Sequence, residues 1–209
     1  MKPLGWMMAF GLIVSSGRVI NFDTATIGQT PPGWTIAMTN RGAAPRWEIL
    51  RDRTAPTPPY VLAQMSADAN GSRFPLAILN GVELRDGDIS VRLKPVAGQQ
   101  EQAGGVVFRY RDPNNYYLAR ANALQQNVAL LKVEDGRRLP IAPAVQHDLP
   151  SNSWRILKIS VRANRFQVYV DHRRVLQAVD NTFQSSGKVG LWTVGDSVTY
   201  FDDFRVNPK

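Results

Sequence analysis

Apolar and polar residues alternate along most of the chain beyond residue 82. The alternation is clear at residues 89–93 and 106–110, where every second residue is apolar. A period of two predicts β-strands with one buried face. Similar stretches predict further strands at residues 116–121, 128–133, 157–161, 166–170, 189–193 and 198–206. Turn-forming residues separate these stretches, and no sustained helical period follows the N-terminus. The pattern therefore predicts an antiparallel sandwich or barrel.

The segment from Thr30 to Ala77 differs from the rest because it is rich in proline. Proline removes a backbone donor and is confined to the edges of sheets, so this segment predicts long loops with one or two edge strands, for instance around residues 46–51. Long loops on a rigid scaffold often carry binding residues.

The N-terminus has the pattern of an export signal. Met1, Lys2 and Pro3 precede an apolar run at residues 4–14, and small residues follow at 15–17. The run is shorter than the roughly 20 residues that span a bilayer. We expect a signal peptide at residues 1–17, a single domain at residues 18–209, and a periplasmic or secreted product without a stable membrane anchor. The alternative is a buried N-terminal strand or helix.

Composition narrows the class of partner. The 209 residues contain no cysteine, which excludes disulfides and thiolate metal sites, and the net charge of +8 comes mainly from arginine. Basic residues are spread along the chain, with only short pairs such as Arg137-Arg138, so no nucleic-acid module is indicated. Arginine can bind carboxylate or sulfate groups in two-pronged fashion, which suits anionic glycans. The alternative is a solvated arginine-rich surface.

Several stretches indicate a family. GGVVFRYRDPNNYYLAR, NVALLKVEDGRR, SWRILKISVRANRFQVYVD and GKVGLWTVGDSVTYFDDFRV, with NFDTATIGQTPPGW near the start, resemble the concanavalin A-like lectin/glucanase superfamily. More narrowly, they are similar to the 3-keto-disaccharide hydrolase domain family. The resemblance implies an all-β fold, a jelly-roll sandwich of two curved antiparallel sheets, extracytoplasmic and concerned with carbohydrate. Fold alone does not fix function.

The hairpin FRYRDPNNYYLARAN, residues 108–122, is the first candidate for a binding surface. It concentrates tyrosine, asparagine and arginine, which supply stacking faces and planar hydrogen-bonding groups for a sugar. Alternation predicts Arg109 and Arg111 on the face away from Phe108, and Tyr116, Leu118 and Arg120 on a shared face. The candidate glycan-binding residues are Arg109, Asp112, Asn115, Tyr116 and Arg120 from the hairpin and Trp192 from the C-terminal stretch LWTVGDSVTYFDDFRV, for which a core tryptophan is the alternative. The alternative is a structural polar hairpin capped by Asp112 and Asn115.

Two aspartates are candidates for a structural calcium site. Asp202 and Asp203 are adjacent in a predicted strand and point to opposite faces, so they do not form a catalytic pair with each other. Asp203 could join Asp23 at the edge of the sandwich and hold Ca²⁺ through carboxylate oxygens.

Three functions remain open at this point. The preferred one is a non-catalytic module that binds a glycan or small saccharide, because the chain lacks the Glu-x-Asp-x-Glu type of strand found in family 16 glycosidases. The second is a hydrolase or lyase acting on 3-keto sugars, with Asp112, Glu83 and His147 as alternative bases and no assigned catalytic residue. The third is a structural or adhesion domain that binds a protein. The sequence does not indicate an oligomeric state.

Overall fold

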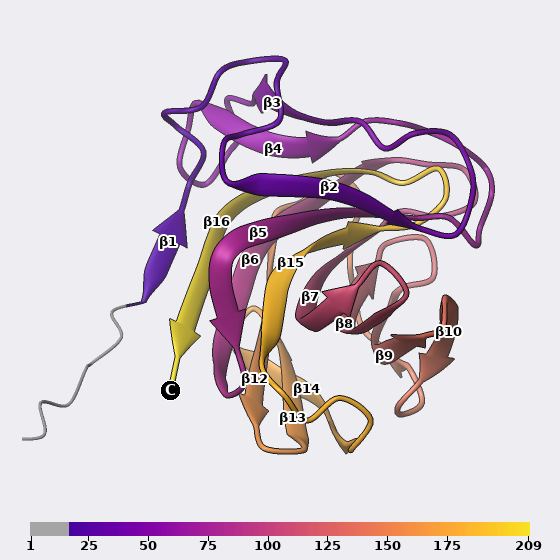
Figure 1. Cartoon of the computed structure of the whole chain (residues 1–209). Coiled ribbons are helices and arrows are strands. Elements are labelled where there is room, and N and C mark those ends of the chain that lie inside the picture. The colour runs from indigo at the N-terminus through magenta and orange to yellow at the C-terminus, as the bar shows by residue number, and fades with distance from the viewer. Residues whose placement is uncertain (1–16) are drawn as a thin grey trace, which may run out of the picture.

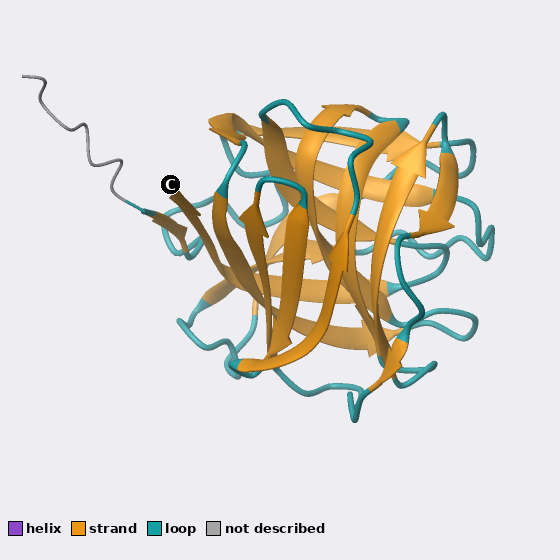
Figure 2. Ribbon diagram, turned by 90° about the horizontal axis from the view of Figure 1, so that it is seen from below, coloured by secondary structure: helices purple, strands orange, loops and turns teal. Residues whose placement is uncertain are grey.

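The computed structural model describes residues 17–209, and all of its regular elements are strands. They form two antiparallel sheets of eight strands each. Figure 1 labels the strands except β11, and Figure 2 shows two layers joined by loops. Sheet A has the order β14-β13-β12-β6-β16-β4-β3, with β1 paired to β16. Sheet B has the order β10-β9-β8-β7-β15-β5-β2, with β11 paired to β9.

The strands of sheet A are β1 (Arg18–Ile20), β3 (Trp47–Arg51), β4 (Tyr60–Gln64), β6 (Gly87–Ala97), β12 (Arg155–Arg162), β13 (Arg165–Val170), β14 (Arg173–Val179) and β16 (Val198–Pro208). Those of sheet B are β2 (Trp34–Thr39), β5 (Phe74–Leu84), β7 (Ala103–Asp112), β8 (Asn115–Asn122), β9 (Asn127–Glu134), β10 (Arg137–Pro140), β11 (Val145–Gln146) and β15 (Gly187–Thr193).

Sheet B buries side chains on both of its faces. Along β8, Tyr117 and Ala119 belong to the main core between the sheets, whereas Tyr116 and Leu118 belong to a second hydrophobic core on the other face. The same alternation occurs in β15, where Leu191 points into the main core and Trp192 into the second core. Side chains on a strand point alternately to opposite faces, so the second core lies on the outer face of sheet B.

The outer face is buried because sheet B curls over itself. Three strands separate β2 from β8 in the sheet, yet the hydroxyl groups of Thr39 and Tyr116 lie 2.8 Å apart. Thr39 also donates a hydrogen bond to the carbonyl of Pro113 in the β7–β8 turn. The two sides of the sheet therefore approach each other across its outer face, and the second core fills the inside of the curl.

The predicted fold class is confirmed, and each of the strands predicted beyond residue 82 lies within an observed strand. The proline-rich segment holds more regular structure than expected, since β2, β3 and β4 lie within it. β2 and β3 are edge strands, as predicted, but β4 lies inside sheet A between β3 and β16. Most of the predicted signal peptide, residues 1–16, lies outside the described residues. No helix that could span a membrane is found in residues 17–209.

Candidate functional site

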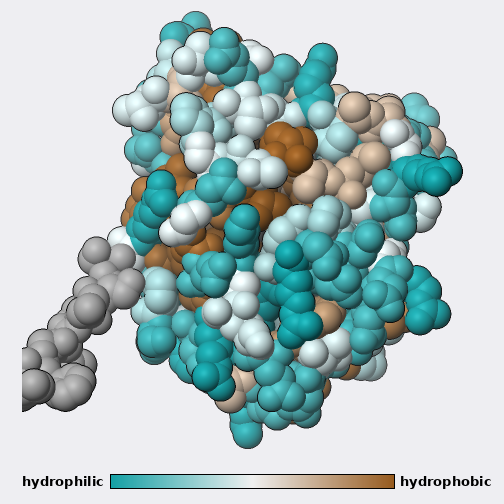
Figure 3. All heavy atoms as spheres, in the orientation of Figure 1, coloured by the Kyte–Doolittle hydropathy of each residue, from teal (hydrophilic) through white to brown (hydrophobic). Residues whose placement is uncertain are grey.

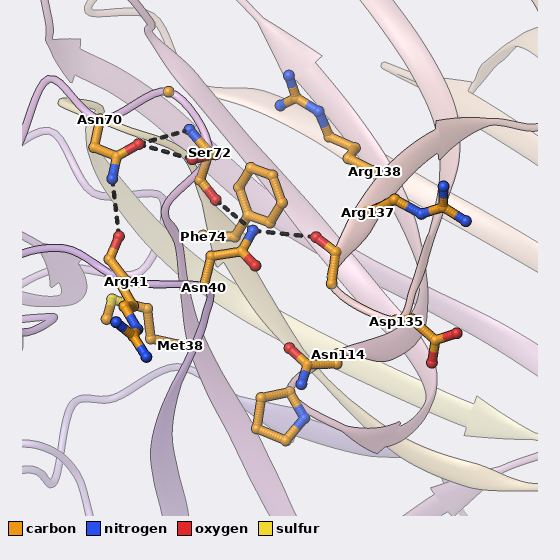
Figure 4. Close-up of a pocket in the computed structure, with 13 residues that line it drawn as sticks. Met38, Asn40, Arg41, Asn70, Ser72, Phe74, Asn114, Asp135, Arg137 and Arg138 are labelled. Carbon is orange, nitrogen blue, oxygen red and sulfur yellow. Dashed lines mark hydrogen bonds between the residues drawn. The ribbon is translucent and has the colours of Figure 1, made fainter.

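A large hollow lies where the two sides of the curled sheet B face each other. It has a volume of about 1070 Å³, and its walls come from four connections between strands as well as from β2, β5 and β10. The residues that line it are Met38, Asn40, Arg41, Asn70, Gly71, Ser72, Phe74, Pro113, Asn114, Asp135, Gly136, Arg137 and Arg138. Figure 4 shows these side chains grouped around the hollow. We call it the main hollow.

Hydrogen bonds fix the rim of the main hollow. The side-chain amide of Asn40 donates to the carbonyl of Ser72 at 2.8 Å and to the carbonyl of Gly136 at 3.1 Å, as the dashed lines in Figure 4 show. Asn40 thereby joins the loop after β2, the loop before β5 and the β9–β10 turn. That turn needs glycine because the φ of Gly136 is +77°, a region that residues with a Cβ rarely adopt.

The two loops on the β2 side are held together by Arg73 and Asn70. The fully buried Arg73 guanidinium donates to the carbonyl of Ala43 at 2.6 Å and to the carbonyl of Gly195 at 3.0 Å. Asn70 donates to the carbonyl of Arg41 at 2.9 Å. These bonds position the Arg41 backbone on a rigid base, although its side chain is exposed.

Aromatic rings lie beneath one guanidinium of the site. Phe74 and Trp192 pack against each other with ring centroids 5.6 Å apart. The Arg138 guanidinium reaches across from β10 and lies 5.1 Å from the Phe74 centroid and 6.0 Å from the Trp192 centroid, within the range of a cation–π interaction. Figure 4 shows Arg138 beside the Phe74 ring. Arg138 therefore covers the aromatic part of the second core.

The main hollow carries excess positive charge. Arg41, Arg137 and Arg138 line it together with a single carboxylate, that of Asp135. None of the three arginines forms an ion pair within the described residues, whereas Arg46, Arg73, Arg92, Arg109, Arg155, Arg162 and Arg205 all do. Figure 3 shows one face of the molecule as mostly hydrophilic, with hydrophobic atoms visible toward its left and centre.

Three predicted binding residues point into the second core, which lies on the outer face of sheet B and inside the curl. Tyr116, Arg120 and Trp192 are on the outer face of sheet B, and Tyr116 shares that face with Leu118 and Arg120 as expected. Tyr116 and Trp192 are completely buried and Arg120 is 5% exposed. Their roles in binding stay predictions, because none of the three lines the main hollow; Arg120 lines a smaller cavity nearby.

The prediction of which face of the strand carries Arg109 is wrong. A β-bulge interrupts β7 between Phe108 and Asp112, and Arg109 has a φ of +48°. A bulge inserts an extra residue and rotates the following side chains to the other face. Arg109 is therefore 1% exposed and donates to the carbonyls of Arg85, Phe183 and Ala163, while Tyr110 packs against the second core.

The other two predicted hairpin residues form the turn itself. The Asp112 carboxylate accepts hydrogen bonds from the backbone N–H of Asn114 at 2.7 Å and from the side-chain amide of Asn115 at 3.1 Å. This is the capping arrangement that a structural turn requires. Pro113 and Asn114 lie between the two predicted residues, and they line the main hollow.

The predicted calcium ligands have different surroundings. The Asp203 carboxylate lies 3.1 Å from the guanidinium of Arg92 and 3.3 Å from that of Arg205. One oxygen of Asp23 is buried without a hydrogen-bond partner. Among residues 17–209, no group of three or more acidic, histidine or cysteine side chains has the arrangement of a metal site. Calcium binding stays a prediction.

Sequence reasoning missed most residues of the main hollow. Apart from Trp192, the predicted candidates came from one hairpin, whereas the hollow also draws on residues 38–41, 70–74 and 135–138. Two features of the sequence did indicate parts of the main hollow. The proline-rich segment was expected to contain binding loops, and Arg137-Arg138 was the visible basic pair. Nothing in the local pattern indicates that these segments meet.

One curated protein is similar over part of the chain. It is the levanase of Bacillus subtilis (strain 168), 31% identical over 137 residues. The match covers 65% of this chain and 19% of the levanase, so the chain spans less than a fifth of that protein. No protein-family model matches the sequence.

Solved structures share the fold. The carbohydrate-binding module CBM66 from Bacillus subtilis has a TM-score of 0.65 and 25% identity, covering 83% of this chain and 94% of the module. The cellulose-induced protein Cip1 has a TM-score of 0.63 and 12% identity, covering 92% of this chain and 97% of that chain. These similarities confirm the resemblance to the concanavalin A-like superfamily. The narrower resemblance to 3-keto-disaccharide hydrolases stays a prediction.

Proposed function

We propose that this protein is an extracytoplasmic, non-catalytic module that binds a saccharide in the main hollow. The observation that carries the proposal is the lining of the hollow, which combines three asparagine amides with three arginine guanidinium groups. Sugar hydroxyls need planar donors and acceptors, and amide and guanidinium groups supply them. The similarity to CBM66, which aligns with almost its whole length, supports the same function.

A binding role is favoured over catalysis by the acidic groups at the site. Glycosidases commonly use two carboxyl groups on either side of the scissile bond. Asp135 is the single carboxylate among the residues described as lining the main hollow. Elimination from a 3-keto sugar needs only one base, so release of product from such a disaccharide is the result that would replace binding with catalysis.

The first experiment is a titration of the purified protein with neutral polysaccharides and oligosaccharides. Levan is included because of the levanase similarity, together with other fructans, glucans and galactosides. The variants Arg41→Ala and Arg137→Ala alter exposed side chains of the rim. We expect each to weaken binding about tenfold or more through loss of charge-assisted hydrogen bonds, with an unchanged melting temperature.

A matched control is Arg165→Ala, which removes an exposed arginine from β13 in sheet A. Its affinity should equal that of the original protein. The proposal fails if no saccharide binds, or if the rim variants bind as well as the control. The extracytoplasmic location is tested separately by N-terminal sequencing of the exported protein, which should begin near Gly17 or Arg18; an intact Met1 would contradict it.

A further inference from the structure

A second, smaller cavity shares Arg138 with the main hollow. It has a volume of about 160 Å³, and Arg138 lines both spaces. Its walls are mostly aliphatic, from Ala129, Leu131, Pro140, Ala142 and Ala144. The polar groups that face it are those of Arg120, Gln125 and Arg138. We call it the arginine cavity.

Arg120 is buried in this cavity with part of its hydrogen-bonding capacity unused. Its two terminal nitrogens donate to the Gln125 side chain at 3.1 Å and to the Asn127 side chain at 2.7 Å. Its third donor, Nε, is buried and has no partner in the described structure, although the residue is only 5% exposed. A buried donor without a partner costs about 1–3 kcal/mol.

Arg138 has the same deficiency. Its Nη1 atom is buried and lacks a hydrogen-bond partner among the described residues. Neither Arg120 nor Arg138 forms an ion pair there, and the two positive charges act on each other. Burial, and then the charge of Arg138, lower the pKa of Arg120 to about 10, while Glu101 acts in the opposite direction. Arg120 therefore remains charged at neutral pH.

Two adjacent guanidinium groups with unused donors are arranged to receive an anion. An arginine guanidinium matches the planar, two-oxygen geometry of a carboxylate. At roughly 30 Å³ for each water molecule, the arginine cavity could also contain several waters. Water would satisfy the donors without neutralising either charge, whereas a carboxylate would do both.

We propose that the arginine cavity binds the carboxylate of an acidic saccharide whose sugar ring occupies the main hollow. Arg138 contacts both spaces and would place the ring and its carboxylate on its two sides. The unpaired Arg41 and Arg137 extend the positive field over the entrance. This inference rests on the proposed function, and it narrows the ligand to saccharides that contain uronic acid.

The test compares acidic saccharides with their methyl esters, which lack the negative charge and carry one extra methyl group. Short oligomers of galacturonic acid and of glucuronic acid are titrated beside their fully methyl-esterified forms, with neutral saccharides as a third group. We expect at least one acid to bind about ten- to a hundredfold more tightly than its ester, because the ester loses the charge-assisted hydrogen bonds. The preference should decrease as salt rises.

Variants then locate the carboxylate. Arg120→Gln and Arg138→Gln should reduce the preference for acid over ester to less than threefold, while Arg165→Gln in sheet A keeps it. If Arg120→Gln does not fold, Arg138→Gln and the ligand pairs on the original protein still decide the question.

Each outcome separates this inference from the proposed function. Equal affinity for acid and ester, or binding of neutral saccharides alone, overturns the carboxylate site and leaves saccharide binding intact. A sulfated disaccharide that binds when the uronic acids do not would overturn the choice of carboxylate. Failure of every saccharide, neutral or acidic, overturns the proposed function and the inference with it.

Discussion

Replacement of Arg109 by alanine should destabilise the protein strongly and leave saccharide affinity unchanged. The guanidinium group holds together three connections between strands. It donates to the carbonyl of Arg85 at 2.9 Å, to that of Phe183 at 2.8 Å and to that of Ala163 at 2.5 Å. It also lies 3.6 Å from the carboxylate of Asp86. None of these groups lines the main hollow.

The magnitude follows from the acceptors that lose their donor. Three carbonyls would become unsatisfied at about 1–1.5 kcal/mol each, taking the low end of the range because water can enter from the neighbouring surface pocket. The expected loss is therefore about 3–5 kcal/mol, as for other broken buried polar networks. Arg109→Lys should recover part of it, since an ammonium group keeps the charge but cannot reach three carbonyls as a planar fork.

The assay is urea unfolding at neutral pH, with saccharide titration of the folded fraction. Arg165→Ala is the control, because exposed substitutions usually change stability by no more than about 0.5 kcal/mol. A loss for Arg109→Ala that matches the control would refute its role in holding these connections together. A loss of affinity per folded molecule would instead return Arg109 to the binding site predicted from the hairpin.

Two further predictions concern buried aspartates with opposite pKa shifts. Burial raises the pKa of Asp202 to about 6, so the folded protein binds an extra proton between about pH 4 and pH 6. The unfolding free energy should therefore fall by up to about 3 kcal/mol as pH rises through that window. Asp202→Asn should remove this fall, and an identical pH profile in the variant would contradict the assignment. Burial opposes the ionisation of Asp196, yet its hydrogen bonds from the backbone N–H groups of residues 99–101 hold its pKa below the usual range. Asp196→Ala should therefore cost about 2–4 kcal/mol at pH 7, with the cost shrinking as pH falls through the native pKa; a cost that does not change in acid would show that charge is not involved.

The sequence was sufficient for the strands because strand formation is read from local alternation. The periods at residues 89–93 and 157–161 correspond to one buried face of sheet A, and the residues there lie in β6 and β12. The resemblance in the C-terminal half supplied the jelly-roll arrangement. The alternation is visible within a single strand, and the resemblance is carried by continuous stretches of sequence.

The site could not be predicted in the same way because it depends on the curl of sheet B. The contact between Thr39 and Tyr116 joins residues 77 positions apart, and Asn40 reaches Gly136 over 96 positions. Neither contact has a periodic signature. The bulge at Arg109 adds a local error, since one extra residue exchanges the two faces of the strand without any apolar signal.

The hairpin FRYRDPNNYYLARAN is neither scaffold alone nor a simple binding surface. Arg109 on its first strand stabilises the connections around the main core, whereas Pro113 and Asn114 at its tip form part of the main hollow. Tyr116 on its second strand connects the tip to β2 through Thr39. A wall held by such bonds before ligand arrives has little conformational entropy left to lose, and so lowers the cost of binding. In the proposed function, Arg109, Asp112 and Tyr116 would therefore support binding by fixing the shape of the hollow, whereas the groups that contact a saccharide would come from β10, the loops beside β2 and, in the arginine cavity, Arg120.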